Sequence, residues 1–575
     1  MMDKRALLAI LLTFVVIFFW GIIQSKFFPQ PPAEQPQKEV KKEEIVPPEK
    51  KEIKPIKDEK PVSKPSRPKV VIKKETIVET NNYIATFTNE DARLKHFKLK
   101  KYEDMVEESS LTIKITQFFQ ELFGGKIEKP KKPEPLDLVN TNNDEGLPLG
   151  LFIQPSSDGD GWEVDKEKLH LLKTGEKGEV VFSKNLRNGL KLLKKYIFSS
   201  EKNIIDLEVE IENTTSNEIS TQIGLEWTGR VELEKFSDNG NKDLGLKYAF
   251  QKDQKVERKD LGGVSSSGCT PGCGSPKKEI EPFESSDQGI IKWYAFEGEY
   301  FTALLIPPSS EKNLLLNIKG NDKNILKAQL TTSPSTIPPK GVIRTNYRVY
   351  LGPKVVDPLT ELGVGAESLI DFGFFTVVAK PLLWFLKMTN TITKNFGIDI
   401  IILSILIKII FLPLTQISMK SMKEMQKVQP EMNRLKEQFK NDNARLQQEI
   451  MLLYNRRKIN PMSGCLPMVI QIPVFIALYN ALQNSIDMRH APFILWIMDL
   501  SAKDPIYVTP IIMGATMVIQ QKMTPTAADP AQAKIFMLMP IMFTFLFLNF
   551  PSGLVLYWMV TNILSIAHQY YMNKK

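Results

Sequence analysis

Apolar and polar residues divide the chain into two unlike parts. Residues 24–353 are rich in charge, whereas residues 369–575 are mostly apolar. Continuous apolar runs of the length needed to cross a bilayer, or close to it, occur at residues 6–23, 398–415, 466–482, 506–519, 534–550 and 554–570. The pattern predicts a multi-pass α-helical membrane protein with six transmembrane helices. The large charged domain falls between the first and second spans.

The charged part has the two-residue period of β-strands. Between Lys195 and Glu212, apolar residues at 205, 207, 209 and 211 alternate with acidic residues, which predicts a half-solvated antiparallel strand. Similar runs occur at Tyr83–Phe87, Phe301–Ile306, Leu314–Ile318 and Tyr347–Leu351. Turns rich in Asn, Gly and Pro separate these runs, without helix–strand alternation. Residues 76–353 are therefore expected to form a large antiparallel β-sandwich, whose face could bind carbohydrate or protein.

Three segments flank these regions. Lys4 and Arg5 precede the run 6–23, so residues 1–5 are expected in the cytoplasm and 6–23 as an uncleaved signal-anchor; a cleaved signal peptide is the alternative. Residues 24–75 consist largely of Pro, Lys and Glu, which predicts a disordered tether. Residues 369–397 hold an apolar run interleaved with Lys380 and Lys387. An interfacial amphipathic helix with a linker is expected there, or else a short buried helix.

Basic residues orient the spans. Residues 416–460 carry a strong basic excess, which predicts a cytoplasmic helical hairpin broken at Pro430 and at the Asn441–Asp442 turn. Methionines at 419, 422 and 425 would form either a pliable contact surface or a packed seam. The loop 483–505 is then periplasmic, as is the β domain. The loop 520–533 and the tail 571–575 are cytoplasmic, as are both termini.

Polar residues gather in the cytoplasmic halves of the spans. Lys408 is a full charge inside an apolar run, which is costly unless water or a polar cavity meets it; snorkelling to the surface is the alternative. The other polar residues there are Gln471, Gln520, Gln521, Thr561, Asn562 and Ser565. The outer halves are nearly all apolar. This favours a dead-end hydrophilic groove over a channel, which would be polar throughout, and over a transporter built from repeats.

Composition limits the chemistry. The chain has a net charge of +9 but only three cysteines and four histidines, so neither a metal site nor any cofactor is expected. Cys269 and Cys273 are close enough in sequence for a local disulfide, or they remain free thiols. Serines 265–267 and Ser552 lack the GxSxG context and a nearby histidine of a hydrolase. No phosphate-binding loop is present. We therefore do not expect an enzyme.

The apolar part carries a series of short motifs that are specific in combination. They are PLT ending at Thr415, then QQEIMLLY, INPMSGCLPMVIQIPVFIALY, GATM, QQKM and LNFPSGLVLYWMV. With these motifs the chain resembles the YidC/Oxa/Alb family of membrane protein insertases, in its Gram-negative form. The resemblance runs from Leu369 to Gln569, and the anchor, tether and β domain agree with it in order and size.

The resemblance implies a five-helix core with a cytoplasm-open hydrophilic groove. Lys408 stands where the family most often has an arginine, and Lys lacks the rigid fork of Arg. Tyr557 and Trp558 match an aromatic pair that faces the inserting helix, with Thr561 a turn below. The implied function is insertion and folding of inner-membrane proteins, alone or with the Sec translocon. The alternative is a tethered binding protein whose β-sandwich captures a glycan or a periplasmic chain.

The resemblance also implies partners. These are nascent membrane proteins, the Sec translocon and membrane lipid, without recognition of a nucleic acid sequence. The tail after the last span is shorter than in members with long basic tails that touch ribosomes. Contact with a ribosome would then depend on basic residues of the hairpin, which are Lys420, Lys423, Lys427, Arg456, Arg457 and Lys458.

Overall fold

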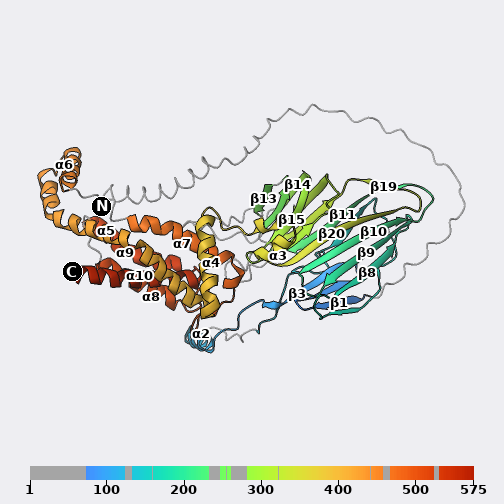
Figure 1. Cartoon of the computed structure of the whole chain (residues 1–575), viewed down its shortest axis with the longest axis horizontal. Helices are drawn as coiled ribbons and strands as arrows, with labels where there is room; N and C mark the ends of the chain where they lie inside the picture. The colour runs from blue at the N-terminus through green and yellow to red at the C-terminus, as the bar shows by residue number, and fades with distance from the viewer. Residues whose placement is uncertain are drawn as a thin grey trace, which may run out of the picture. The chain divides into compact units, whose positions relative to one another are not determined.

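The computed structural model describes most of the chain beyond the tether. The described residues are 73–123, 132–157, 159–231, 247–253, 255–260, 282–321, 323–440, 442–457, 466–523 and 530–574. The predicted signal-anchor, nearly all of the predicted tether, the Cys269–Cys273 pair and Lys458 lie outside these residues. Apart from one helix at Ser110–Phe123, the described regular elements up to Pro353 are strands, and helices follow them (Figure 1).

Three sheets hold the strands between Glu75 and Pro353. The first has the order β4 (Pro135–Asp137), β3 (Arg93–Glu103), β2 (Tyr83–Thr88), β1 (Glu75–Thr80), β7 (Lys168–Leu171). The second has the order β13 (Lys255–Asp260), β12 (Lys247–Lys252), β15 (Ile291–Glu297), β16 (Phe301–Ile306), β20 (Val342–Pro353), β10 (Ile204–Asn213), β9 (Leu190–Ser199), β8 (Lys177–Asn185), β6 (Glu163–Val164). The third has the order β14 (Phe283–Gly289), β17 (Leu314–Gly320), β18 (Ile325–Thr331), β11 (Ile219–Arg230), β19 (Ser335–Ile337), with β5 (Gly150–Gln154) paired to β11.

Pairing among the described strands is antiparallel except between β1 and β7. The stretch expected as one strand from Lys195 to Glu212 forms two, because the polar residues 200–203 turn the chain between β9 and β10. The alternation itself is as expected: the apolar residues at 205, 207, 209 and 211 are buried, and acidic residues lie on the other face of β10. Two of these, Asp206 and Glu210, each accept a hydrogen bond of 2.8 Å from an arginine of β20.

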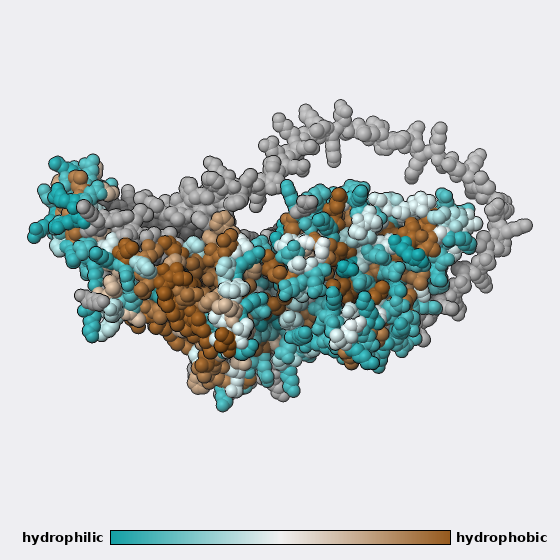
Figure 2. Space-filling view, in the orientation of Figure 1, coloured by the Kyte–Doolittle hydropathy of each residue, from teal (hydrophilic) through white to brown (hydrophobic). Residues whose placement is uncertain are grey.

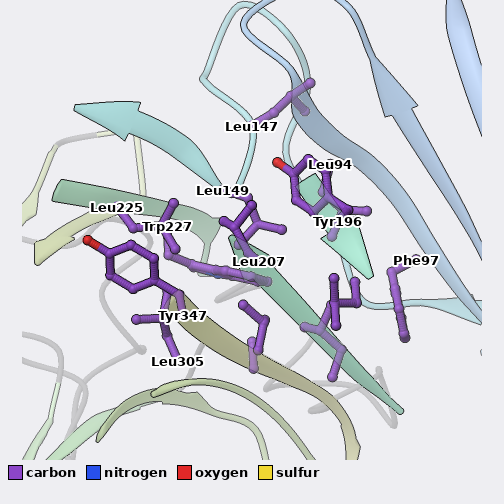
Figure 3. Packing of buried hydrophobic residues seen from close by; sticks show 14 of the residues in the cluster. Leu94, Phe97, Leu147, Leu149, Tyr196, Leu207, Leu225, Trp227, Leu305 and Tyr347 are labelled. Carbon is purple, nitrogen blue, oxygen red and sulfur yellow. The ribbon is translucent and has the colours of Figure 1, made fainter. Parts of the chain in front are cut away.

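One large apolar core joins the sheets. Side chains from all three contribute to it, including Phe97 of β3, Tyr196 of β9 and Trp227 of β11, each at most 4% exposed. Figure 3 shows residues of β3, β9, β10, β11, β16 and β20 converging on this core. Burial of this much apolar surface is the main driving force for folding of the domain.

The described helices are α2 (Ser110–Phe123), α3 (Val356–Glu361), α4 (Thr376–Thr393), α5 (Phe396–Gln438), α6 (Asn443–Arg456), α7 (Leu466–Asn484), α8 (Val508–Met523), α9 (Pro530–Phe547) and α10 (Ser552–Lys574). Two short 3₁₀ turns, η2 (Ala366–Leu369) and η4 (Ile486–Met488), interrupt the connections. Helix α2 is not expected from the sequence; it lies between β3 and β4, inside the predicted β domain.

The predicted break at Pro430 is wrong. Helix α5 continues without interruption from the expected span through Pro413 and Pro430 to Gln438. A proline removes one backbone hydrogen bond but need not end a helix whose packing continues on both sides. Here Val428 and Met432, on either side of Pro430, are buried against Leu453 of α6. The second predicted break is present, since α5 ends at Gln438 and α6 begins at Asn443.

The helical part has an extensive apolar surface. Figure 2 shows hydrophobic residues forming a nearly continuous area over the middle of the helical part, whereas α6 is mostly hydrophilic and the strand region is mixed. By length and composition, one of the described helices, α5, could cross a membrane, and a shorter apolar helix covers Met537–Phe547. The six-span count therefore stays a prediction.

Candidate functional site

A chain of hydrogen bonds joins polar residues of three helices. Lys408 Nζ of α5 donates to Ser565 Oγ of α10 at 2.7 Å, and that hydroxyl donates to the Thr561 carbonyl at 2.7 Å. Thr561 Oγ1 donates to the Tyr557 carbonyl at 2.8 Å. Gln471 Nε2 of α7 donates to the Tyr557 hydroxyl. We call these five residues the polar cluster.

The spacing of residues on α10 explains this arrangement. Residues 557, 561 and 565 recur every four positions and so lie on one face of the helix. A serine or threonine inside an apolar helix can satisfy its hydroxyl by donating to the carbonyl four residues earlier, as Thr561 and Ser565 do. The Ser565 oxygen then remains available to accept from the lysine. One face of α10 thus presents oxygen acceptors toward α5 and α7.

Lys408 is half-buried and carries its charge into this apolar setting. An ammonium group has three donors, and Ser565 satisfies one of them. Among the described residues, no carboxylate forms an ion pair with Lys408. A partly desolvated cation without a counter-charge is a favourable place for an anionic or strongly polar group to bind.

Other predicted site residues lie beside the polar cluster. Asn562 Nδ2 donates to Thr516 Oγ1 of α8 at 3.3 Å, so α10 is also connected to α8. Gln520 and Gln521 lie about one turn further along α8 than Thr516 and are partly buried. The structure thus brings polar groups of α5, α7 and α8 onto α10.

The adjacent aromatic residues have different surroundings. Tyr557 is fully buried, and its hydroxyl belongs to the polar cluster. Trp558 packs against Phe475 of α7 and Phe547 of α9, with ring centroids 5.0 and 5.3 Å away, and against Phe543 at 6.3 Å. Aromatic rings in edge and tilted contacts at these distances attract each other while keeping an apolar surface. Trp558 therefore joins α10 to the apolar helices α7 and α9.

The basic residues of α5 and α6 fall into two groups. Lys427 pairs with Glu424 at 2.7 Å, Arg457 pairs with Glu431, and Lys423 Nζ donates to the Met572 carbonyl near the end of α10. Lys420 and Arg456 are exposed. A lysine at helix-end carbonyls is a favourable cap, so Lys423 holds α10 to α5. The methionines favour the packed-seam alternative, since Met419 is buried and Met425 packs in the seam between α5 and α6.

Two contacts of the site are not expected from the sequence. Ser565 is the partner of Lys408, and Thr516 is the partner of Asn562. The signal for Ser565 is its position four residues after Thr561, on the same helix face. His568, one turn beyond Ser565, has both ring nitrogens buried without a hydrogen-bond partner among the described residues.

Two family models match successive parts of the chain. Residues 126–385 match a model described as the YidC periplasmic domain, and residues 388–575 match a model described as 60Kd inner membrane protein. These matches define the class: an inner-membrane protein whose apolar helices carry the polar cluster and whose antiparallel β domain is periplasmic.

Full-length relatives identify the family. A membrane protein insertase YidC from Syntrophus aciditrophicus is 39% identical over 100% of both chains. One from Geotalea daltonii is 38% identical over 100% of this chain and 99% of its own. The chain belongs to the YidC family of membrane protein insertases. A crystal structure of an active YidC insertase covers 87% of this chain at 19% identity, with a TM-score of 0.36, which is too low to establish a shared arrangement.

Proposed function

We propose that the chain inserts proteins into the inner membrane and helps them fold. The polar cluster is the observation that supports this most directly, together with membership of the insertase family. In this proposal the chain spans the membrane six times, with both termini in the cytoplasm and the β domain in the periplasm. The polar cluster lines a hydrophilic groove that opens to the cytoplasm and to lipid.

The proposed mechanism is non-covalent. A polar segment of the substrate cannot cross hydrocarbon unless its hydrogen-bonding groups are satisfied. Lys408 offers unused donors, and the neighbouring hydroxyl and amide groups offer further partners. The apolar segment of the same substrate meanwhile partitions into lipid, beside the aromatic surface of Trp558. The free energy for insertion comes from this partitioning and from the membrane potential.

Lysine gives the groove a particular selectivity. An arginine would hold a carboxylate through two parallel hydrogen bonds, whereas an ammonium group acts as a point charge with rotatable donors. The ammonium group of Lys408 can therefore stop donating to Ser565 and donate to a substrate carboxylate, or to any other acceptor, with little geometric constraint. We expect the site to tolerate varied polar tails and to favour acidic ones.

Partners follow from the same proposal. We place nascent membrane proteins in the groove and expect cooperation with the Sec translocon. Ribosome contact is assigned to exposed basic residues such as Lys420 and Arg456. Lys423 is a weaker candidate for that contact because it caps α10.

Site-specific photocrosslinking tests the proposed path. A photoreactive residue at 408, 558 or 561 should form adducts with a ribosome-bound single-span membrane protein, moving along the groove as the nascent chain lengthens. Ile410 is the matched control, because it lies two residues from Lys408 on α5 and its side chain is 61% exposed on the apolar surface. Adducts from a further photoreactive residue placed in the β domain, with none from the three groove positions, would overturn the proposal and favour a binding protein.

Substitution of Lys408 tests the role of its charge. Lys408→Met should lower insertion of a substrate with an acidic tail by roughly 10-fold, which corresponds to about 1.4 kcal/mol, a typical value for one charge-assisted hydrogen bond. Lys408→Arg should retain most activity, and a substrate with a neutral tail should be less affected. Ile410→Met is the control. Equal loss for acidic and neutral tails would show that the charge does not select the tail.

A further inference from the structure

Helix α2 carries one apolar stripe whose large side chains are partly or largely exposed. Leu111, Ile115 and Phe118 recur at i, i+4 and i+7, which places them on one side of the helix. Leu111 is 39% exposed and Phe118 is 60% exposed. Gln117 falls away from this stripe, and Lys114 lies at its edge. Among the described residues, neither Leu111 nor Ile115 belongs to the apolar core of the β domain.

The segment between β3 and β4, which contains α2, begins at a residue that is hydrogen-bonded to the helical part of the chain. Strand β3 ends at Glu103, and the Arg489 guanidinium donates to the Glu103 carbonyl at 2.7 Å. The same guanidinium lies 5.4 Å from the ring centroid of Phe301 on β16. Arg489 directly follows η4, in the loop between α7 and α8. The start of the connection between β3 and β4, which contains α2, is therefore attached to this loop.

Helix α4 is attached to the same short loop. Lys387 of α4 pairs with Asp487 of η4 at 2.6 Å. Beyond this contact, α4 exposes a series of large apolar side chains, with Val377 84%, Trp384 65% and Ile392 85% exposed. Such a helix in a membrane protein is typical of one lying at the lipid–water boundary. Residues 487–489 thus contact both a membrane-surface helix and the start of the β3–β4 connection that contains α2.

The distance from Glu103 to α2 is short. Residues 104–109 separate them, and six residues span at most about 20 Å when fully extended. The exposed stripe of α2 can therefore reach the surface on which α4 lies. Lys114 at the edge of the stripe is placed to extend its ammonium group toward lipid phosphates while its methylenes cover apolar surface.

We propose that α2 is a second membrane-surface helix, which inserts Leu111, Ile115 and Phe118 into the outer leaflet of the inner membrane. The occupant of the stripe is lipid, because the segment that carries the stripe and the helix α4, with its exposed apolar side chains, are attached to the same short loop, and because Lys114 lies at the edge of the stripe. The β domain then contacts the bilayer through α2, in addition to being joined to the membrane part through the ends of its own chain. This inference goes beyond membrane protein insertion and rests on the proposed membrane topology, with the β domain and α4 on the periplasmic side.

Spin labelling of the full-length protein tests the proposal. The native cysteines 269, 273 and 465 are replaced by serine, and single cysteines at 111, 117, 118 and 392 carry a nitroxide. The protein is reconstituted in vesicles of phosphatidylethanolamine and phosphatidylglycerol. Collisions with oxygen report lipid, and collisions with a water-soluble nickel complex report solvent. We expect oxygen to dominate at 111 and 118, as at the α4 position 392, and nickel to dominate at 117.

Each other result overturns the proposal. Nickel dominating at both 117 and 118 would place α2 in water, and low accessibility of 118 to both reagents would show a protein partner instead. A second test does not depend on a single position. With the label at 115, the double substitution Leu111→Gln, Phe118→Gln should lower the oxygen accessibility relative to the same label in the otherwise unchanged protein. The spectra do not depend on insertion activity. Failure here would therefore leave the proposed function intact, and activity of each labelled protein shows that it is folded.

Discussion

Lys194 is an unusual residue, because a lysine is rarely buried completely. It lies on β9 and is 0% exposed, and its Nζ donates to the carbonyls of Ala92 at 2.6 Å and Leu149 at 2.7 Å. The hydroxyl of Tyr196 donates to the same Ala92 carbonyl at 2.8 Å. Burial lowers the pKa of Lys194 well below its usual value, and the charge of Arg93 adds to this effect. One side chain thus ties β9 to two segments that precede it in the sequence.

Truncating Lys194 should therefore be costly. Lys194→Ala leaves two buried carbonyls with one partner fewer and creates a cavity, so we expect a loss of about 2–4 kcal/mol in the free energy of unfolding. The neighbouring Lys195 is the matched control, since it forms a partly exposed ion pair with Glu179 at 2.8 Å. Lys195→Ala should cost about 1 kcal/mol or less. Denaturant unfolding of the full chain in detergent, followed by the β-sheet circular dichroism signal, measures both; equal losses would contradict this account.

At the level of elements, α8 and α9 approach closely at one glycine. A Cβ added to Gly514 would lie 2.0 Å from Thr544 Oγ1, far below van der Waals contact. That hydroxyl is held by donating to the Pro540 carbonyl at 2.7 Å, so it does not move freely. Small residues allow apolar helices to pack closely in this way.

This contact predicts a rescue. Gly514→Ala should destabilise the helical part by about 1–3 kcal/mol, the usual cost of overpacking. Adding Thr544→Ala removes the clashing hydroxyl and leaves only a Cβ contact of 3.2 Å, so the double variant should recover most of the loss. The melting temperature in detergent measures all three variants. If Thr544→Ala lowers the melting temperature equally with and without Gly514→Ala, the two positions are independent and the contact is not tight.

The sequence predicts these elements unevenly, for physical reasons. Alternation predicts β10 well because one face of the strand is buried and the other is solvated. Helix α5 runs longer than expected because its packing against α6 continues past Pro430. Helix α2 escapes detection because three apolar positions at helical spacing give a weak signal inside a β domain. The hydropathy pattern predicts that Lys408 and Gln471 lie inside apolar helices. It does not predict the Lys408–Ser565 contact, because that contact depends on how α5 and α10 are rotated about their axes.

At the scale of the whole molecule, the β domain meets the helical part at the loop after η4. This junction includes Arg489 and the next residue, His490. The charged groups that act on the His490 imidazole are Arg489 and Asp104. Burial, and then the Arg489 charge, lower the pKa of His490 to about 4. The carboxyl of Asp499 accepts from the His490 backbone, and burial raises the pKa of Asp499. The junction therefore contains two groups that respond to acid in opposite directions.

Acid should loosen this junction through His490. The pKa of His490 is lowered on folding from 6.5, so its stabilising contribution is complete above pH 6.5 and is lost as the pH falls toward about 4. The rate of hydrogen exchange of residues 101–104 and 486–490, corrected for intrinsic rates, should rise as the pH falls from 6.5 toward about 4. His490→Gln cannot titrate and should remove the rise, whereas Asp499, whose raised pKa stabilises the fold in acid, remains in both proteins. A rise of equal size in the variant would assign the effect to another group, and no rise in either would show that the imidazole does not control the contact.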